Sequence, residues 1–144
     1  MKVLWVEDHQ PVREMLEIAA DKAARNRIQI DLVLATTLME AEARIRLERF
    51  DLVVLDLILP DCHDPEMTIA RAANMGNYRI AVVSGNEDRD RAVANAVRFG
   101  CNISPEAVSK ASLPFNRFIQ RPASFENFLL DFMPKEEIGD SKAA

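Results

Sequence analysis

Four stretches of the chain are almost wholly apolar, and the segments between them repeat apolar residues every three or four positions. The apolar stretches lack polar alternation, which is typical of strands buried on both faces of a parallel sheet. The spacing in the intervening segments predicts amphipathic helices. Strands and helices that alternate in this way predict a parallel sheet with right-handed crossovers. The predicted strands are residues 1–6, 30–35, 51–57 and 79–84.

Local signals mark the beginnings of the first three helices. Pro11 lies in the first turn of the helix that follows the first strand, where proline is tolerated. Thr37 and Glu40 form a capping box at the second helix. Asp64 followed by Pro65 is a strong N-terminal signal for the third. With a helix after each strand, we expect a doubly wound α/β sheet with helices on both faces.

The regular pattern ends after the fourth helix, at Gly100. Residues 101–116 contain several turn-forming residues without a clear period. We therefore expect an irregular insertion between the fourth helix and a fifth strand, which we predict at residues 115–120. A last helix, capped by Ser124, is expected to follow.

Composition and charge fit one domain. A chain of 144 residues, 49% hydrophobic and 28% charged, is long enough for a sizeable core. We expect this domain to cover residues 1–133 and the polar residues 134–144 to form a disordered tail.

The net charge of −5 argues against nucleic-acid binding. No apolar run approaches the roughly 20 residues of a membrane span, and the acidic start is unlike a secretory signal, so a cytoplasmic protein without membrane partners is expected.

Polar side chains follow three of the predicted strands at the point where each ends. Glu7 and Asp8 follow the first strand, Asp56 ends the third, and Ser84 ends the fourth. The carboxyl ends of parallel strands form one edge of a sheet, where ligands bind. Three neighbouring carboxylates repel one another unless a cation lies among them, and oxygen ligands suit Mg²⁺. The sequence therefore predicts a magnesium site at this edge.

Asp56 is a candidate phosphate acceptor. An isolated Asp at a strand end is more often a turn residue, and adjacent acids often only stabilise a helix N-terminus. Here several polar groups are expected to converge, which favours a functional site. Mg²⁺ beside a carboxylate neutralises an incoming phosphoryl group. Asp56 could then form an acyl phosphate, with the Ser84 hydroxyl and a Lys or Arg binding the phosphoryl oxygens.

These motifs together resemble the receiver domains of two-component response regulators, of the CheY-like family. The resemblance extends from Lys2 to about Met133, and the matching stretches are VLWVEDH, DLVVLDLILPD, AVVSGN and FIQRPASFENFL. It implies a flavodoxin-like receiver fold. It also implies phosphorylation of Asp56 by a histidine kinase or a histidine phosphotransfer protein, with Ser84 as the switch hydroxyl.

The resemblance also implies a set of metal ligands for Mg²⁺. They are the carboxylates of Glu7, Asp8 and Asp56 and the backbone carbonyl of Ile58. The sequence departs from the family pattern eight positions after Asp56, where Asp64 stands in place of the glycine that the family tends to carry.

The cation of the site departs furthest from the family, which has a Lys before a Pro and an aromatic switch residue three positions earlier. If the sequence VSK is the last strand, the cation is Lys110, with Ala107 at the aromatic position and no Pro after it. If FIQRP is the last strand, the cation is Arg121, followed by Pro122, with Phe118 as the switch aromatic. We favour Arg121 and keep Lys110 as the alternative.

The sequence thus predicts a single-domain response regulator that switches a protein–protein interaction face after phosphorylation. That face is expected to consist of the fourth helix, the fifth strand and the last helix, and its downstream partner is a protein. The chain is not expected to be an enzyme beyond its own phosphotransfer and dephosphorylation. The alternative is a non-switching interaction or adaptor module with the same fold. A phosphohydrolase is disfavoured, because no second acid lies two positions after Asp56.

Overall fold

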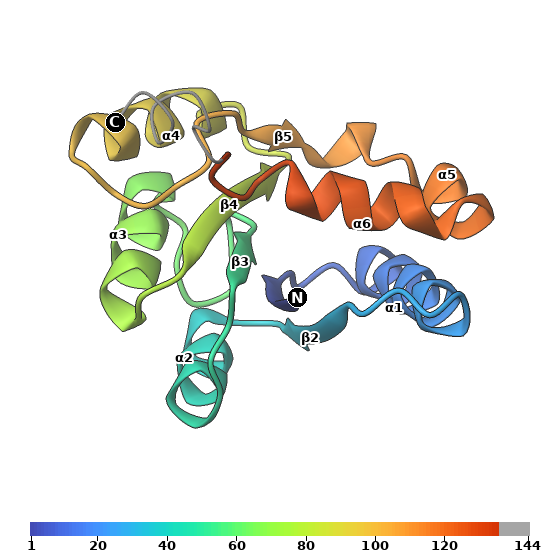
Figure 1. Ribbon diagram of the computed structural model, residues 1–144. Coiled ribbons are helices and arrows are strands. Elements are labelled where there is room, and N and C mark those ends of the chain that lie inside the picture. Colours follow the sequence, from blue (N-terminus) through green and yellow to red (C-terminus); the bar gives the residue numbers. More distant parts are fainter. Residues whose placement is uncertain (136–144) are drawn as a thin grey trace, which may run out of the picture.

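A five-stranded parallel sheet lies at the centre of the computed structural model, which describes residues 1–135 (Figure 1). The strands are β1 (Lys2–Val6), β2 (Asp31–Ala35), β3 (Leu52–Leu55), β4 (Arg79–Ser84) and β5 (Val108–Ser109). They lie in the order β2-β1-β3-β4-β5, and every neighbouring pair is parallel. This order confirms the predicted doubly wound sheet and brings the carboxyl ends of the strands to one edge.

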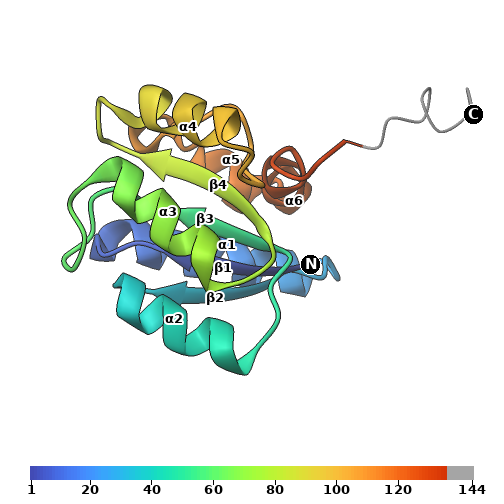
Figure 2. The same ribbon diagram turned by 90° about the vertical axis from the view of Figure 1, so that its left-hand side faces the viewer.

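Helices cover both faces of this sheet, as Figure 2 shows. One layer consists of α1 (Gln10–Arg25), α5 (Phe115–Gln120) and α6 (Pro122–Leu130), which contact one another. The other layer consists of α2 (Leu38–Leu47), α3 (Pro65–Met75) and α4 (Arg89–Arg98). A short 3₁₀ helix, Lys110–Ser112, follows β5.

The sheet separates two hydrophobic clusters, one under each helical layer. Along β1, Leu4 belongs to the cluster under α2, α3 and α4, whereas Trp5 belongs to the cluster under α1, α5 and α6. Both side chains are fully buried. Because successive strand residues point to opposite faces, a strand with two buried faces is apolar at every position. This is why the strand sequences show no alternation.

The predicted helix starts are confirmed at α2 and α3. The Thr37 hydroxyl accepts a hydrogen bond from the Glu40 N–H, at 3.0 Å. Asp64 accepts hydrogen bonds from two backbone N–H groups at the start of α3, and Pro65 is the first residue of that helix. These polar caps satisfy donors that have no partner within the helix.

The prediction of a fifth strand at residues 115–120 was wrong. Strand β5 lies earlier and pairs with Val83 and Ser84 of β4, while residues 115–120 form helix α5. Of the segment predicted to be irregular, residues 101–116, the part before 108 precedes the last strand, whereas Val108 and Ser109 form that strand. The physical reason is burial on the α1 face, where Phe118 packs against Phe125 and Phe128 with ring centroids 5.0 and 5.1 Å apart.

The start of the last helix also differs from the prediction. Ser124 does not cap α6, because it lies inside this helix and donates its hydroxyl to the carbonyl of Arg117. Helix α6 begins at Pro122, a favourable first helical residue. Of the predicted tail, residues 134–144, all but the first two lie outside the described residues. No described helix is both long enough and apolar enough to cross a membrane.

Candidate functional site

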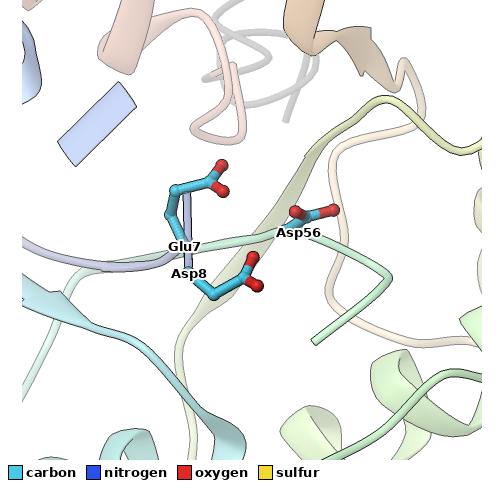
Figure 3. Close-up of side chains that lie close together, drawn as sticks. All are labelled: Glu7, Asp8 and Asp56. Carbon is cyan, nitrogen blue, oxygen red and sulfur yellow. The ribbon is translucent and has the colours of Figure 1, made fainter. Parts of the chain in front are cut away.

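The carboxyl edge of the sheet holds the acidic residues that the sequence singled out. Glu7 directly follows β1 and Asp56 directly follows β3, and the preceding residues Val6 and Leu55 are paired across the sheet. Oxygen atoms of the Glu7, Asp8 and Asp56 carboxylates lie within 4.8 Å of one another. Figure 3 shows the three side chains gathered at this edge. The predicted convergence of carboxylates is therefore present.

Both carboxylate oxygens of Asp56 accept hydrogen bonds. The Ser84 hydroxyl donates to Oδ1 at 2.9 Å, and the N–H of Ile58 donates to the same oxygen at 3.3 Å. The ammonium of Lys110 donates to Oδ2 at 2.6 Å. Asp56 is only 4% exposed. A hydroxyl and a cation thus lie at the two oxygens of one buried carboxylate.

Glu7 lies deeper than its neighbours and is fully buried. Its Oε2 accepts hydrogen bonds from Lys110 Nζ at 2.9 Å and from the N–H of His9 at 3.0 Å. Its Oε1 is buried and has no hydrogen-bond partner among the described residues. Burial raises the pKa of Glu7, and the hydrogen bond from Lys110 only partly offsets this.

Lys110 is the cation that contacts the carboxylates. It follows β5 directly, and its ammonium lies between Glu7 and Asp56. Burial alone would lower the pKa of Lys110, but the hydrogen bonds to Asp56 and Glu7 outweigh it and raise the pKa above the usual value. Lys110 is therefore charged at neutral pH.

The favoured assignment of the cation, Arg121, does not agree with this geometry. Arg121 lies exposed between α5 and α6, and within residues 1–135 its side chain makes no hydrogen bond or ion pair with the site carboxylates. Phe118 is 1% exposed in the core under α5, and it is not on a strand. Both assignments depended on a fifth strand at residues 115–120, which is a helix.

Ser84 connects Asp56 to the loop between β4 and α4. Its hydroxyl oxygen accepts hydrogen bonds from the N–H groups of Asn86 at 3.1 Å and Leu57 at 3.4 Å. Asn86 in turn accepts from the N–H of Asp88, at 2.8 Å. A displacement of the Ser84 hydroxyl would therefore alter contacts at the beginning of α4.

Sequence reasoning missed Arg13, which lies beside the acidic pair. Its guanidinium donates to the backbone carbonyls of Glu7, at 3.3 Å, and of Asp8. Arg13 lies near the start of α1, five residues after Asp8. Its nearness in sequence to the acidic pair was the feature from which this contact could have been predicted. Arg13 thereby fixes the backbone that carries both acids.

The residues present fit a magnesium ion. Glu7, Asp8 and Asp56 supply oxygen atoms, which Mg²⁺ prefers. Among the described residues, the buried Oε1 of Glu7 has no hydrogen-bond partner. A cation bound by the Glu7 carboxylate would compensate this buried acceptor. The role of the Ile58 carbonyl stays a prediction.

The comparisons with known proteins concern the fold. No protein-family profile matches the chain, and no curated protein sequence matches it. Similar solved structures include a two-component response regulator from Clostridium difficile, 20% identical with a TM-score of 0.63 over 88% of this chain and 96% of that chain. The non-phosphorylated HemR receiver domain from Leptospira biflexa is 21% identical, with a TM-score of 0.62 over 94% and 98%. The BeF3-activated N-terminal receiver domain of Klebsiella pneumoniae RstA is 20% identical, with a TM-score of 0.59 over 90% and 98%.

Proposed function

We propose that this chain, which has the fold of CheY-like response-regulator receiver domains, accepts a phosphoryl group on Asp56 and acts as a signalling switch. The observation that carries the proposal is the pair of contacts at Asp56, with the Ser84 hydroxyl at one carboxylate oxygen and the Lys110 ammonium at the other. Such a pair can stabilise the charge of a phosphoryl group on the carboxylate.

The phosphoryl donor in this proposal is a phosphohistidine of a histidine kinase or a histidine phosphotransfer protein. An Asp56 oxygen attacks phosphorus, a P–O bond forms, the P–N bond breaks, and the imidazole nitrogen keeps the electron pair of that bond. The product is an acyl phosphate on Asp56. Lys110 and the Ser84 hydroxyl lie where they can bind its oxygens, since both already contact the carboxylate.

Glu7, Asp8 and Asp56 are the proposed ligands of Mg²⁺, together with the backbone carbonyl of Ile58. When bound, the ion supplies positive charge that neutralises the phosphoryl oxygens. Arg13 supports this set by holding the backbone of the two adjacent acids.

The proposed switch runs through Ser84 to helix α4. When the hydroxyl moves to bind the phosphoryl group, its contacts with Asn86 and Leu57 change, and with them the loop that leads to α4. A downstream protein then distinguishes the two packings at the face that α4 and β5 form. This is a shift between two populations, driven by the contacts that only the phosphorylated state makes.

A second candidate function is a constitutive interaction module with the same fold. One observation favours it, since the aromatic switch that the sequence suggested is absent from the sheet edge. Ala107 precedes β5 and is packed against the core, while Phe118 is a buried residue of α5. Such a module would bind its partner equally well whether or not Asp56 carries phosphate.

Phosphotransfer with a matched variant tests the proposal. The chain is incubated with Mg²⁺ and a small phosphodonor. Phosphoryl incorporation is measured by intact mass, and the lability of the incorporated group to base is then tested. Wild type is expected to gain one base-labile phosphoryl group, whereas Asp56→Asn gains none. Omission of Mg²⁺ is expected to abolish the reaction in wild type.

Beryllofluoride then separates the switch from the constitutive module. The switch predicts changes in the amide NMR signals of residues 84–89 when Mg²⁺ and beryllofluoride are added to wild type, and no change in Asp56→Asn. Phosphoryl incorporation without any such change would support the constitutive module. No incorporation and no spectral change would reject phosphorylation of Asp56.

A further inference from the structure

Asp61 joins the loop after Asp56 to a helix that is far away in the sequence. Its Oδ1 accepts a hydrogen bond from the N–H of Leu38 at 3.0 Å, and its Oδ2 accepts one from the N–H of Met39 at 2.9 Å. Leu38 and Met39 are the first two residues of α2, and their N–H groups have no partner within the helix. Both oxygens of one carboxylate are therefore committed to α2.

The carboxylate of Asp61 is charged when it makes these contacts. Burial would raise the pKa of Asp61, but the hydrogen bonds from Leu38 and Met39 outweigh it and lower the pKa below the usual value. A negative charge at the N-terminus of a helix is favourable, because the helix dipole is positive there.

The loop that carries Asp61 is a tight turn held by backbone hydrogen bonds. Leu59 and Cys62 exchange two backbone hydrogen bonds, at 2.9 and 3.2 Å, so Pro60 and Asp61 form the tip of a tight turn. Leu59 is 1% exposed and Cys62 is 7% exposed. The turn is thus packed at its base and attached to α2 at its tip.

The other end of this loop is attached to α3. The hydroxyl of Thr68, which is fully buried, donates to the carbonyl of Leu57 at 3.0 Å. Ile58 lies between these two attachments, and its N–H contacts Asp56. The backbone of Ile58 is therefore fixed by Thr68 on one side and by the turn of Asp61 on the other.

We infer that Asp61 is a positioning residue of the phosphorylation site, which holds the backbone of Ile58 in place by attaching its loop to the N-terminus of α2. This inference rests on the proposed function, because it concerns the backbone carbonyl of Ile58, a proposed ligand of Mg²⁺. Asp61 does not touch Asp56, and it acts through the turn between Leu59 and Cys62.

A plain helix cap is the competing explanation, and Thr37 offers a matched control. Thr37 caps the same helix by accepting from the Glu40 N–H, and within residues 1–135 its side chain makes no hydrogen bond with the loop of residues 57–62. Removing either cap weakens α2 by a similar amount, about 1 kcal/mol for a typical cap. Only removal of Asp61 releases the loop.

The test is a titration of the full chain with Mg²⁺ alone. Binding is measured by calorimetry and by the amide NMR signals of residues 56–58. Asp61→Ala is expected to raise the Kd for Mg²⁺ about 10-fold, the size of effect that residues supporting metal ligands have. Thr37→Ala is expected to leave the Kd within about 2-fold of wild type. Asp61→Asn keeps one acceptor oxygen and should give an intermediate Kd.

Each outcome separates this inference from the proposed function. Equal Mg²⁺ affinity in wild type, Thr37→Ala and Asp61→Ala would overturn the positioning role and leave phosphorylation of Asp56 intact. Equal losses in Thr37→Ala and Asp61→Ala would assign the effect to helix α2 and likewise overturn it. If wild type itself does not bind Mg²⁺, the basis of both proposals is removed.

Discussion

The ammonium of Lys110 lies 2.9 Å from Oε2 of Glu7, although 103 residues separate them in the sequence. The same nitrogen lies 2.6 Å from Oδ2 of Asp56. Glu7 is fully buried and Asp56 almost so. Without this cation, two neighbouring carboxylates would repel each other in a region of low water content. Lys110 therefore stabilises the fold as well as the proposed reaction.

Replacing Lys110 by methionine tests both roles. Lys110→Met removes two charged hydrogen bonds, so we expect the free energy of unfolding in metal-free buffer to fall by about 2 kcal/mol. Phosphoryl transfer to Asp56 should slow by on the order of 100-fold, because a charge-stabilising donor is lost. Urea unfolding and the rate of phosphoryl incorporation measure the two effects.

Arg121→Met is the matched control for this variant. Arg121 is exposed, and within the described residues it makes no hydrogen bond or ion pair with the site carboxylates. Its replacement should therefore change stability by less than about 0.5 kcal/mol and leave the transfer rate unaltered. A slower transfer in Arg121→Met than in Lys110→Met would contradict the assignment of Lys110.

Ser84→Ala should uncouple phosphorylation from the loop before α4. The variant loses the hydrogen bond to Asp56 and leaves the N–H of Asn86 without its partner, which should cost about 1–2 kcal/mol of stability. Phosphoryl incorporation should persist at a reduced rate, whereas the beryllofluoride-induced NMR changes at residues 85–89 should disappear. Ser124→Ala, which changes an exposed hydroxyl on α6, should retain them.

Phe118 is expected to matter for stability and not for switching. It packs against Phe125 and Phe128 under α5, so Phe118→Ala should lower the free energy of unfolding by about 3–5 kcal/mol. The milder Phe118→Leu should keep the wild-type response to beryllofluoride. Loss of that response in a folded Phe118→Leu protein would instead support an aromatic switch. Phe99→Ala, at a side chain that is 83% exposed, is the control for aromatic removal.

Tyr78 gives the fold a dependence on alkaline pH. Burial raises its pKa from 10.0 to about 12, and its hydroxyl donates to the carbonyl of Ala72. A raised pKa means that the folded chain holds this proton more tightly than the unfolded chain. The contribution to stability is therefore complete below pH 10 and is lost as the pH rises toward 12.

Urea unfolding of wild type and Tyr78→Phe over that pH range measures the effect. Wild type should be the more stable at neutral pH, because the variant leaves a buried carbonyl without its donor. The difference should shrink as the pH rises above 10. A difference that stays constant would show that the two states bind this proton equally.

The sequence was sufficient for the first four strands and for the residues at their ends. Their signal is direct, since a strand buried on both faces is apolar throughout, and Glu7, Asp56 and Ser84 interrupt that pattern where the strands end. The convergence of these residues follows from parallel pairing alone.

The segment after Gly100 could not be predicted in the same way. Strand β5 has only two residues, too few to show a period. The spacing of Phe115, Phe118 and Ile119 is typical of a helix. The match of Phe118, Arg121 and Pro122 to a family motif instead favoured a strand. The tertiary contacts of Lys110 with Glu7 and Asp56 decide the question, and such contacts leave no trace in a local pattern.

The shortness of β5 gives the site a different vulnerability from the rest of the sheet. Two residues, Val108 and Ser109, pair with Val83 and Ser84, and Lys110 comes next in the chain. An edge strand with so few pairs separates from the sheet at a lower free energy than complete unfolding requires. Amide protons of β5 should then exchange with solvent sooner than those of β1 and β3, and each such opening withdraws the positive charge from the two carboxylates.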